Sequence, residues 1–520
     1  MWAKVHSAQI VGLKADLVEV EIDIGKGLHS FGVVGLPDKA VEEAKDRISA
    51  AIKNSGFKSP QKSNKKVIVS LAPADLKKEG PVFDLAIALA YLLASGEIKF
   101  KPAGKLFLGE LALDGTLRPI KGALMIARKA KTAGFQELYL PTLNAEEAAL
   151  IQGVAVYGCR SLKELTNHLS PPVTEEGQFQ PLIILKPQPA TEIVSERGNF
   201  DIDLADVKGQ QTAKRGLEIA AAGGHNIAMS GPPGTGKTML AKAFGGILPP
   251  LDFEAVLEAT GIHSAAGLLE HIIITAPPFR APHHTSSYVS LVGGGNWPKP
   301  GEITLAHRGV LFLDEFPEFD KRVIESLRQP LEDRTINIAR AKGSMTFPAN
   351  FILIAAMNPC PCGNKGLRSR ECICSQVALM RYQRKLSGPI VDRIDLWLEV
   401  AQVDHEKLSA AYGGEESSAT VRERVLAARA KQHARFAART GKHQITTNSE
   451  MGAKDLRRFA PLSPSATKLL NDSAKRLDLS ARAYHRVIKL ARTIADLAQA
   501  DNIAEDHLLE ALQYRPKVSF

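Results

Sequence analysis

The chain has 520 residues, of which 44% are hydrophobic and 23% charged, and its formal net charge is +10 at pH 7. This length predicts two to four domains, and the composition is that of an ordinary globular protein. Five cysteines are too few for a disulfide scaffold, no apolar run reaches the ~18 residues of a membrane-spanning helix, and the first residues lack a signal-peptide core. We therefore expect a cytoplasmic protein whose positive charge suits a polyanionic partner.

Composition and periodicity divide the chain into four parts. Residues 1–170 mix short β-branched runs with helical segments, which predicts an α+β domain, and 171–200 are rich in proline without periodicity, which predicts an extended linker. Residues 201–402 alternate strands and helices, so the predicted fold class is α/β with a doubly wound parallel sheet. Residues 403–520 are nearly all helical in pattern, and a basic run at 422–442 fits either a solvated helix face or a contact with DNA.

One motif in the third part carries the strongest chemical signal. It lies between a strand-like segment, 226–230, and a helical one, 239–244. Glycines in such a loop let backbone N–H groups close around phosphates at a helix N-terminus. Lys237 would reach the β- and γ-phosphates, and the hydroxyl of Thr238 would ligate Mg²⁺. The motif, which predicts binding of a nucleoside triphosphate, consists of Gly231, Pro232, Pro233, Gly234, Thr235, Gly236, Lys237 and Thr238.

Polar residues follow two further apolar strands. The run 310–313 delivers Asp314 and Glu315 to its carboxyl end, and 351–357 ends in Asn358. One carboxylate would hold Mg²⁺, the second would polarise the attacking water, and the amide could orient that water. An acidic pair could also cap a helix, and an asparagine before proline is often only a turn residue.

Four of the five cysteines follow Asn358 directly, in the pattern C-x-C-x9-C-x-C. They are Cys360, Cys362, Cys372 and Cys374. Four thiolates in two pairs suit tetrahedral Zn²⁺, with free reduced thiols or an iron–sulfur or redox role as the alternatives.

These elements together resemble the AAA+ ATPases. The resemblance implies ATP and Mg²⁺ as cofactors, a helical lid after the sheet, and an arginine supplied by a neighbouring subunit of a homo-oligomer, here a homohexamer. The segment 386–395 looks like the arginine-finger region, with Arg393 as the candidate. The segment 479–486 is similar to the second-sensor helix, where Arg482 matches best and Arg486 is a rival.

Two insertions look like the magnesium-chelatase-type branch of these ATPases. One spans 280–303, and the other reads as a hairpin of 335–340 and 344–348 with Lys342 at its tip. In that branch the hairpin lines the ring pore, so Lys342 would contact DNA phosphates, although an exposed turn residue is the alternative. The adjacent His283 and His284 lack a metal-ligand spacing, which favours a structural role.

The first part narrows the resemblance. Residues 80–84, 108–111 and 115–122 are similar to the Lon protease domain, but Val82 and Leu124 stand where its serine–lysine dyad would be. A dyad needs a nucleophile and a base, so we expect a Lon-like fold without peptidase activity. The order of a Lon-like domain, a chelatase-type ATPase and a helical lid resembles the ComM (YifB) family over essentially the whole chain.

That resemblance implies a ring-forming, ATP-driven DNA motor. Its expected activity is helicase action or branch migration on recombination intermediates in natural transformation, on single-stranded or branched DNA with little sequence specificity. The alternative is a magnesium-chelatase-like motor that remodels a protein partner.

Overall fold

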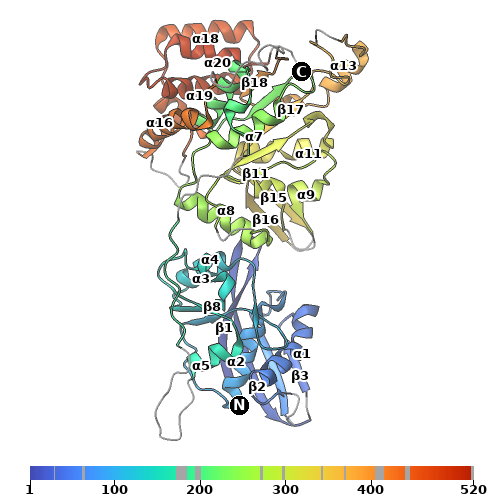
Figure 1. The fold of residues 1–520 in the computed structure, drawn as a ribbon, viewed down its shortest axis with the longest axis vertical. Coiled ribbons are helices and arrows are strands. Elements are labelled where there is room, and N and C mark those ends of the chain that lie inside the picture. The colour runs from blue at the N-terminus through green and yellow to red at the C-terminus, as the bar shows by residue number, and fades with distance from the viewer. Residues whose placement is uncertain are drawn as a thin grey trace. The chain divides into compact units, whose positions relative to one another are not determined.

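The computed structural model shows two compact units (Figure 1). The first comprises Met1–Val194 with Val256–Ile274, and the second Ser195–Ala255 with Thr275–Phe520. The structure describes residues 1–28, 30–60, 65–170, 184–193, 201–269, 273–295, 299–340, 343–367, 370–403, 415–437, 439 and 445–516. In these ranges no helix is long and apolar enough to cross a membrane.

A mixed sheet with helices forms the first unit. In its described residues seven strands lie in the order β3-β4-β2-β1-β5-β8-β9, and β6 pairs with β7 separately. The strands are β1 (Trp2–Val11), β2 (Lys14–Lys26), β3 (Ser30–Val34), β4 (Lys65–Ala72), β5 (Lys105–Phe107), β6 (Glu110–Leu111), β7 (Leu117–Arg118), β8 (Glu137–Pro141) and β9 (Ala155–Cys159). The helices are α1 (Lys39–Asn54), α2 (Asp84–Ser95), α3 (Ala123–Thr132), α4 (Thr142–Ala148) and α5 (Leu162–Leu169). The pairs β1–β2 and β2–β4 are antiparallel, and the pairs on either side of them, β3–β4 at one end and β1–β5, β5–β8 and β8–β9 at the other, are parallel.

The positions that stand in place of a dyad are apolar and packed. Leu124 is buried in α3, and Val82 is half-buried in a short helical turn before α2. Neither side chain offers a nucleophile or a base.

A segment from later in the chain also belongs to the first unit. Val256–Ile274 includes most of α8 (Phe253–Ala266), which follows the helix of the phosphate-loop motif in sequence. The Ser264 hydroxyl donates to the Glu147 carboxylate and accepts the Gly122 N–H at 2.9 Å. A side chain at Gly261 would lie 2.4 Å from the Met125 methyl carbon, so the helix packs closely there. The chain therefore returns to the first unit after the phosphate-loop motif and leaves it again before the later ATP-site residues Asp314, Glu315 and Asn358.

One buried carboxylate makes the stability of the first unit depend on pH. Asp84, 1% exposed, accepts from Arg47 Nε at 3.0 Å and from the Leu111 N–H at 3.3 Å. Burial raises the pKa of Asp84 to about 6, and the bond from Arg47 opposes part of that rise. A raised pKa favours folding below the unfolded value, and this contribution is lost as the pH rises through about 6.

Replacing Arg47 by alanine should therefore destabilise the protein more at neutral pH than at pH 5. At neutral pH the variant buries an unpaired carboxylate, which costs about 3 kcal/mol, whereas at pH 5 Asp84 takes up a proton. Urea midpoints at the two pH values measure the difference. Arg118→Ala is the control, because its pair with Glu110 is 61% exposed on the arginine side. An equal loss for Arg47→Ala at both pH values would contradict the assignment.

The second unit is built on a five-stranded parallel sheet. Its order is β11 (Phe279–Arg280), β14 (Val310–Leu313), β17 (Ile352–Met357), β10 (Ile227–Ser230) and β18 (Leu396–Glu399). Every residue of β14 and β17 is buried, as expected for central strands with both faces covered. The predicted α/β class and doubly wound parallel sheet are confirmed.

Helices and two small strand pairs surround this sheet. On the ATPase side they are α6 (Gln211–Gly223), α7 (Lys237–Ile247), α9 (Tyr288–Val292), α10 (Glu302–Leu305), α11 (Lys321–Ser326), α12 (Arg328–Asp333), α13 (Gln376–Gln383) and α14 (Gly388–Val391), with β12 (Gly293–Gly294) paired to β13 (Lys299–Pro300) and β15 (Thr335–Arg340) paired to β16 (Gly343–Pro348). The predicted hairpin is thus present as β15 and β16. Its tip residue Lys342 lies outside the described residues.

The predicted helical domain is present at the end of the chain, drawn in orange to red in Figure 1. Its described helices are α16 (Ser418–Ala437), α17 (Ala453–Phe459), α18 (Pro464–Arg476), α19 (Ala481–Leu497) and α20 (Glu505–Gln513). Val425 and Phe436 of α16 share one buried core with Phe244 of α7. The helical domain and the sheet therefore form a continuous core.

The basic run at 422–442 is used largely inside the protein. Arg424 pairs with Glu218 and Glu416, and Arg435 pairs with the buried Asp496. Arg422, Arg429 and Lys431 donate to backbone carbonyls, and Arg439 pairs with Asp455. In the described residues this run attaches α16 to its neighbours, so it gives little support to a free DNA-binding face.

Candidate active site

Three neighbouring strands bring the predicted motif residues together. β14, β17 and β10 are adjacent and parallel, and they end at Asp314, Asn358 and the phosphate loop. Carboxyl ends of parallel strands meet at one edge, where ligands of such sheets bind. The site is therefore a consequence of strand order, since the three segments lie far apart in sequence.

The phosphate loop depends on its glycines. Gly234 and Gly236 have φ values of 76° and 90°, in the left-handed region where glycine is favoured, and α7 begins at Lys237 directly afterwards. A side chain at Gly231 would lie 2.1 Å from the Val400 carbonyl oxygen. The loop can thus turn its backbone N–H groups inward above a helix N-terminus, which is a favourable place for phosphate.

Lys237 lies inside this loop. Its ammonium group donates to the carbonyls of Gly231 at 2.6 Å and Pro232 at 2.8 Å, and to the Asn358 side-chain oxygen at 3.3 Å. Burial lowers the pKa of Lys237, while the Asp314 carboxylate opposes part of that effect. Lys237 and Asn358 are thus in direct contact, so a ligand at the lysine would be sensed at the end of β17.

The residues that would hold Mg²⁺ are also in contact. The Thr238 hydroxyl donates to Asp314 Oδ2 at 2.9 Å, and the Glu315 N–H donates to Asp314 Oδ1 at 2.9 Å. A hydroxyl and a carboxylate beside a phosphate loop are oxygen ligands of the kind that Mg²⁺ takes together with phosphate and water. The donor set therefore fits the ion.

Glu315 is held in a strained position. Its φ of 52° lies in the left-handed region, which non-glycine residues rarely adopt. Its carboxylate lies 3.0 Å from His284 Nδ1, and its side chain is 53% exposed. Strain of this kind persists where surrounding contacts fix it, and it is concentrated at functional sites. The His284 contact was missed in the sequence because the two residues lie on different segments.

A cavity connects these groups. It measures about 670 Å³ and is lined by residues of the phosphate loop, by Asp314, Glu315 and Asn358, and by His283 and His284. This volume lies in the range of small-molecule sites. The lining places an ammonium group, a magnesium ligand set and an exposed carboxylate around one space.

His284 should matter for turnover rather than for nucleotide binding. In His284→Ala the Glu315 carboxylate loses its fixed partner, so we expect kcat for ATP hydrolysis to fall about 10-fold with an unchanged nucleotide Kd. His283→Ala is the matched control, because His283 Nδ1 instead contacts the Thr285 hydroxyl at 2.8 Å. Steady-state ATPase rates and nucleotide titrations measure both effects; equal losses in the two variants would contradict a specific role.

The two predicted arginines lie together, away from the lining of this cavity. Arg393 is 8% exposed, donates to the Pro389 carbonyl at 2.7 Å and pairs with Glu332. Arg482 pairs with the other oxygen of Glu332 at 3.2 Å and is 58% exposed. The rival Arg486 pairs with the buried Asp395 instead. Glu332 thus joins the arginine-finger candidate to the second-sensor candidate.

These arginines line a second cavity of about 650 Å³. Its lining includes six arginine and lysine residues, namely Arg308, Arg334, Arg393, Arg482, Arg486 and Lys489, against four carboxylates, Glu332, Asp333, Asp395 and Glu450. Burial lowers the pKa of Lys489 to about 8. The excess of cations makes this face favourable for an anionic group.

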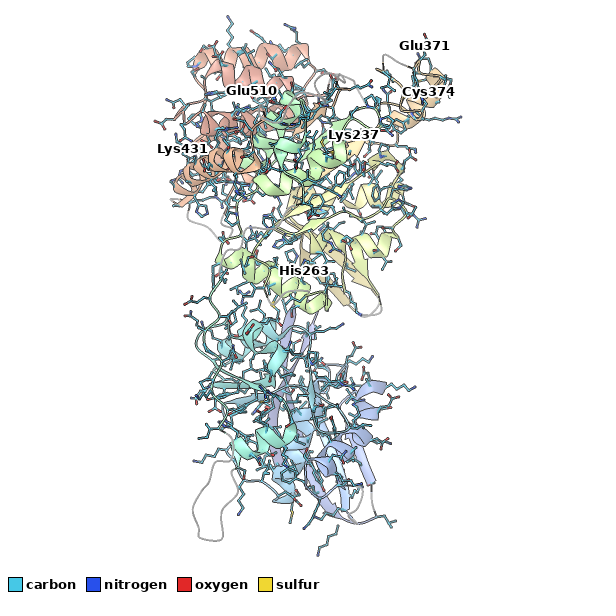
Figure 2. All side chains as sticks on the ribbon, viewed as in Figure 1. Lys237, His263, Glu371, Cys374, Lys431 and Glu510 are labelled. Atoms are coloured by element: carbon cyan, nitrogen blue, oxygen red, sulfur yellow. The ribbon has the colours of Figure 1, made fainter. Side chains whose placement is uncertain are left out.

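The four cysteines converge. Their sulfur atoms all lie within 4.8 Å of one another, and the Cys360–Cys362 and Cys362–Cys372 distances are 3.4 and 3.7 Å. A backbone N–H from Asn364 lowers the pKa of Cys362 to about 6, which favours its thiolate. Four sulfur donors in such a cluster fit a closed tetrahedral metal site. Figure 2 labels Cys374 in this cluster and Lys237 in the phosphate loop.

Family models match most of the chain. The model described as "Magnesium chelatase, subunit ChlI" matches residues 203–408, "Subunit ChlI of Mg-chelatase" matches 20–144, and "Magnesium chelatase, subunit ChlI C-terminal" matches 415–515. Together with the parallel sheet and the phosphate-loop site, they define a magnesium-chelatase-like AAA+ ATPase, a class that uses ATP and Mg²⁺.

Full-length relatives identify the family. YifB of Escherichia coli is 43% identical over 518 residues, covering 98% of this chain and 96% of the relative. Competence protein ComM of Haemophilus influenzae is 43% identical over 528 residues, covering 99% and 98%. The magnesium-chelatase 67 kDa subunit of Heliobacterium mobile is 27% identical over 195 residues, covering 32% and 29%. The chain belongs to the ComM/YifB family.

Proposed function

We propose that this protein is a ring-forming, ATP-driven motor that acts on DNA, with helicase or branch-migration activity on recombination intermediates in natural transformation. The observation that carries the DNA assignment is the full-length similarity to a protein named for competence, the capacity of cells to take up DNA. Because its proposed substrate is DNA, we place its activity in the cytoplasm.

The chain's own residues account for ATP hydrolysis. Lys237 and the loop N–H groups would bind the phosphates, and Thr238 and Asp314, which are in contact, would hold Mg²⁺, whose charge would stabilise the negative charge on the phosphates. Glu315, held by His284, accepts a proton from the attacking water. Asn358 positions that water beside Lys237.

A complete site needs a second subunit under this proposal. Arg393 and Arg482 meet at Glu332 and do not line the cavity at Lys237 among the described residues. A guanidinium supplied by a neighbour stabilises the charge that develops during phosphoryl transfer. The surface around the cationic second cavity would meet the ATP bound by the neighbouring subunit. If every subunit meets its neighbour in this way, the subunits close into a ring, and we propose a homohexamer.

Three further roles complete the proposal. The hairpin of β15 and β16 would carry Lys342 into the pore, where an ammonium group contacts DNA phosphates without reading sequence. The four cysteines would bind one structural Zn²⁺. Residues 1–170 would be a Lon-like domain without peptidase activity, followed by the linker at 171–200, the ATPase core at 201–402 and the helical lid at 403–520.

The test is the ATPase rate at low salt with and without single-stranded or branched DNA. We expect stimulation by DNA that weakens as salt increases, because backbone contacts release counterions. Absence of stimulation would overturn the DNA assignment and favour the alternative, a magnesium-chelatase-like motor that remodels a protein.

A further inference from the structure

We propose that the four-cysteine loop controls nucleotide binding, because a metal ion held by its sulfurs fixes a loop that packs directly against the phosphate loop. This inference rests on the proposed zinc site. It adds a regulatory role to that site: the metal state of the loop sets the affinity for ATP.

The first contact is between Gly363 and Pro233. Gly363 directly follows Cys362, and its N–H donates to the Cys360 carbonyl at 3.0 Å. A side chain at Gly363 would lie 2.9 Å from Pro233 Cδ and 3.2 Å from Cγ. The cysteine loop and the phosphate loop are therefore in van der Waals contact at a position where an added carbon does not fit.

The second contact runs through Asn358. Its side chain accepts from Lys237, and its carbonyl accepts from the Tyr382 hydroxyl at 3.1 Å. Cys360 follows Asn358 by two residues, and α13, which carries Tyr382, begins two residues after Cys374. Both ends of the cysteine loop therefore connect to the residue that contacts the phosphate-binding lysine.

The sulfur spacing matches a single metal ion. Tetrahedral zinc with Zn–S bonds of about 2.3 Å places its sulfurs about 3.8 Å apart. The Cys362–Cys372 and Cys372–Cys360 distances are both 3.7 Å, and the Cys360–Cys362 distance is 3.4 Å. Bound metal would thus hold the two cysteine pairs in the arrangement that the structure shows. Without the metal, the two cysteine pairs are no longer cross-linked, and the segment that carries Gly363 loses that support against Pro233.

Two glycine variants separate this contact from a general effect on the loop. Gly363 and Gly366 both have left-handed φ values, 77° and 89°, so alanine strains the backbone at either position. A side chain at Gly366 meets nothing within 4 Å, whereas one at Gly363 meets Pro233. Gly363→Ala should therefore weaken nucleotide binding while Gly366→Ala leaves it close to wild type.

The experiment measures metal content and nucleotide Kd on the full-length protein. Zinc is quantified by mass spectrometry, then removed with a zinc chelator under reducing conditions, and the protein is returned to Mg²⁺ buffer. We expect one zinc per chain, a roughly 10-fold rise in the Kd of a fluorescent ATP analogue after removal, and recovery when zinc is added back. We expect the same rise in Gly363→Ala with its zinc content unchanged.

Two kinds of result overturn the inference, and they differ in what they leave standing. If zinc binds stoichiometrically but its removal leaves the nucleotide Kd unchanged, the coupling is wrong and the zinc site stands. The same holds if the two glycine variants have equal effects on the Kd. A protein that neither contains nor takes up zinc overturns the zinc site as well. Neither result bears on ATP hydrolysis or on DNA stimulation, which the ATPase assay tests separately.

Discussion

Glu315→Gln should bind ATP with near-normal affinity and lower its turnover about 1000-fold. The amide keeps the size and position of the side chain beside His284 but cannot accept a proton from water, so only the catalytic step is lost. Thr238 and Asp314, which would hold Mg²⁺, are unchanged. Nucleotide titration and steady-state phosphate release measure the two properties on the same protein.

Glu318→Gln is the matched control. Glu318 lies on the same segment but pairs with Lys385 at 2.7 Å and does not line the cavity. Its turnover should stay within about twofold of wild type. If Glu315→Gln keeps substantial turnover, the water-activating role assigned to Glu315 is wrong.

The second prediction concerns the ATPase activity of rings assembled from two variants that are each inactive alone. Lys237→Ala subunits lack a working phosphate loop, and Arg393→Ala subunits lack the proposed trans arginine, so each should be inactive alone, with losses of about 1000-fold or more. In a mixture, interfaces form between an intact Lys237 and an intact Arg393, and ATPase activity should return to a substantial fraction of wild type. Recovery requires that the two residues act across an interface.

Arg393 is buried against Glu332, so its removal can also destabilise the fold. Arg482→Ala is therefore run in parallel, since Arg482 is exposed and its loss should leave folding intact. Exposed Arg457 gives the control for loss of positive charge in the helical domain. Mixtures that stay inactive for both Arg393→Ala and Arg482→Ala would contradict an intersubunit site.

Much of the ATPase core was predictable from sequence because its signals are local. β14 has the predicted bounds, 310–313, since four apolar residues bounded by a glycine and an acidic pair define a buried strand. The phosphate loop was predictable because its glycines, lysine and threonine must occur at fixed spacing. Their meeting with Asp314 followed from the rule that ligands lie at the carboxyl ends of parallel strands.

Contacts between distant segments could not be predicted in this way. Nothing near His284 indicates that it pairs with Glu315, and nothing near Glu332 indicates that it joins Arg393 to Arg482. The sequence of α8 does not indicate which unit buries this helix. Ser264 and its bond to Glu147 assign that helix to the first unit only once the structure is known.

The count of charged residues in the sequence also did not show which side chains are free to bind a partner. The basic run at 422–442 reads the same in sequence whether its side chains face DNA or carboxylates of the same chain. Arg424 and Arg435 are held by Glu218 and Asp496, which lie far from them in sequence. The net charge of a segment therefore does not show whether it forms a binding face, because ion pairs within the protein neutralise part of that charge.

The central claim, an ATP-driven motor on DNA, is tested most directly by branch migration of a labelled four-way junction, run beside Lys237→Ala. The account predicts that the wild-type protein converts the junction to duplex products only when ATP and Mg²⁺ are present. Lys237→Ala should give no product above the spontaneous rate. A wild-type protein that hydrolyses ATP in the presence of the junction yet leaves both it and a forked duplex unchanged would contradict the claim.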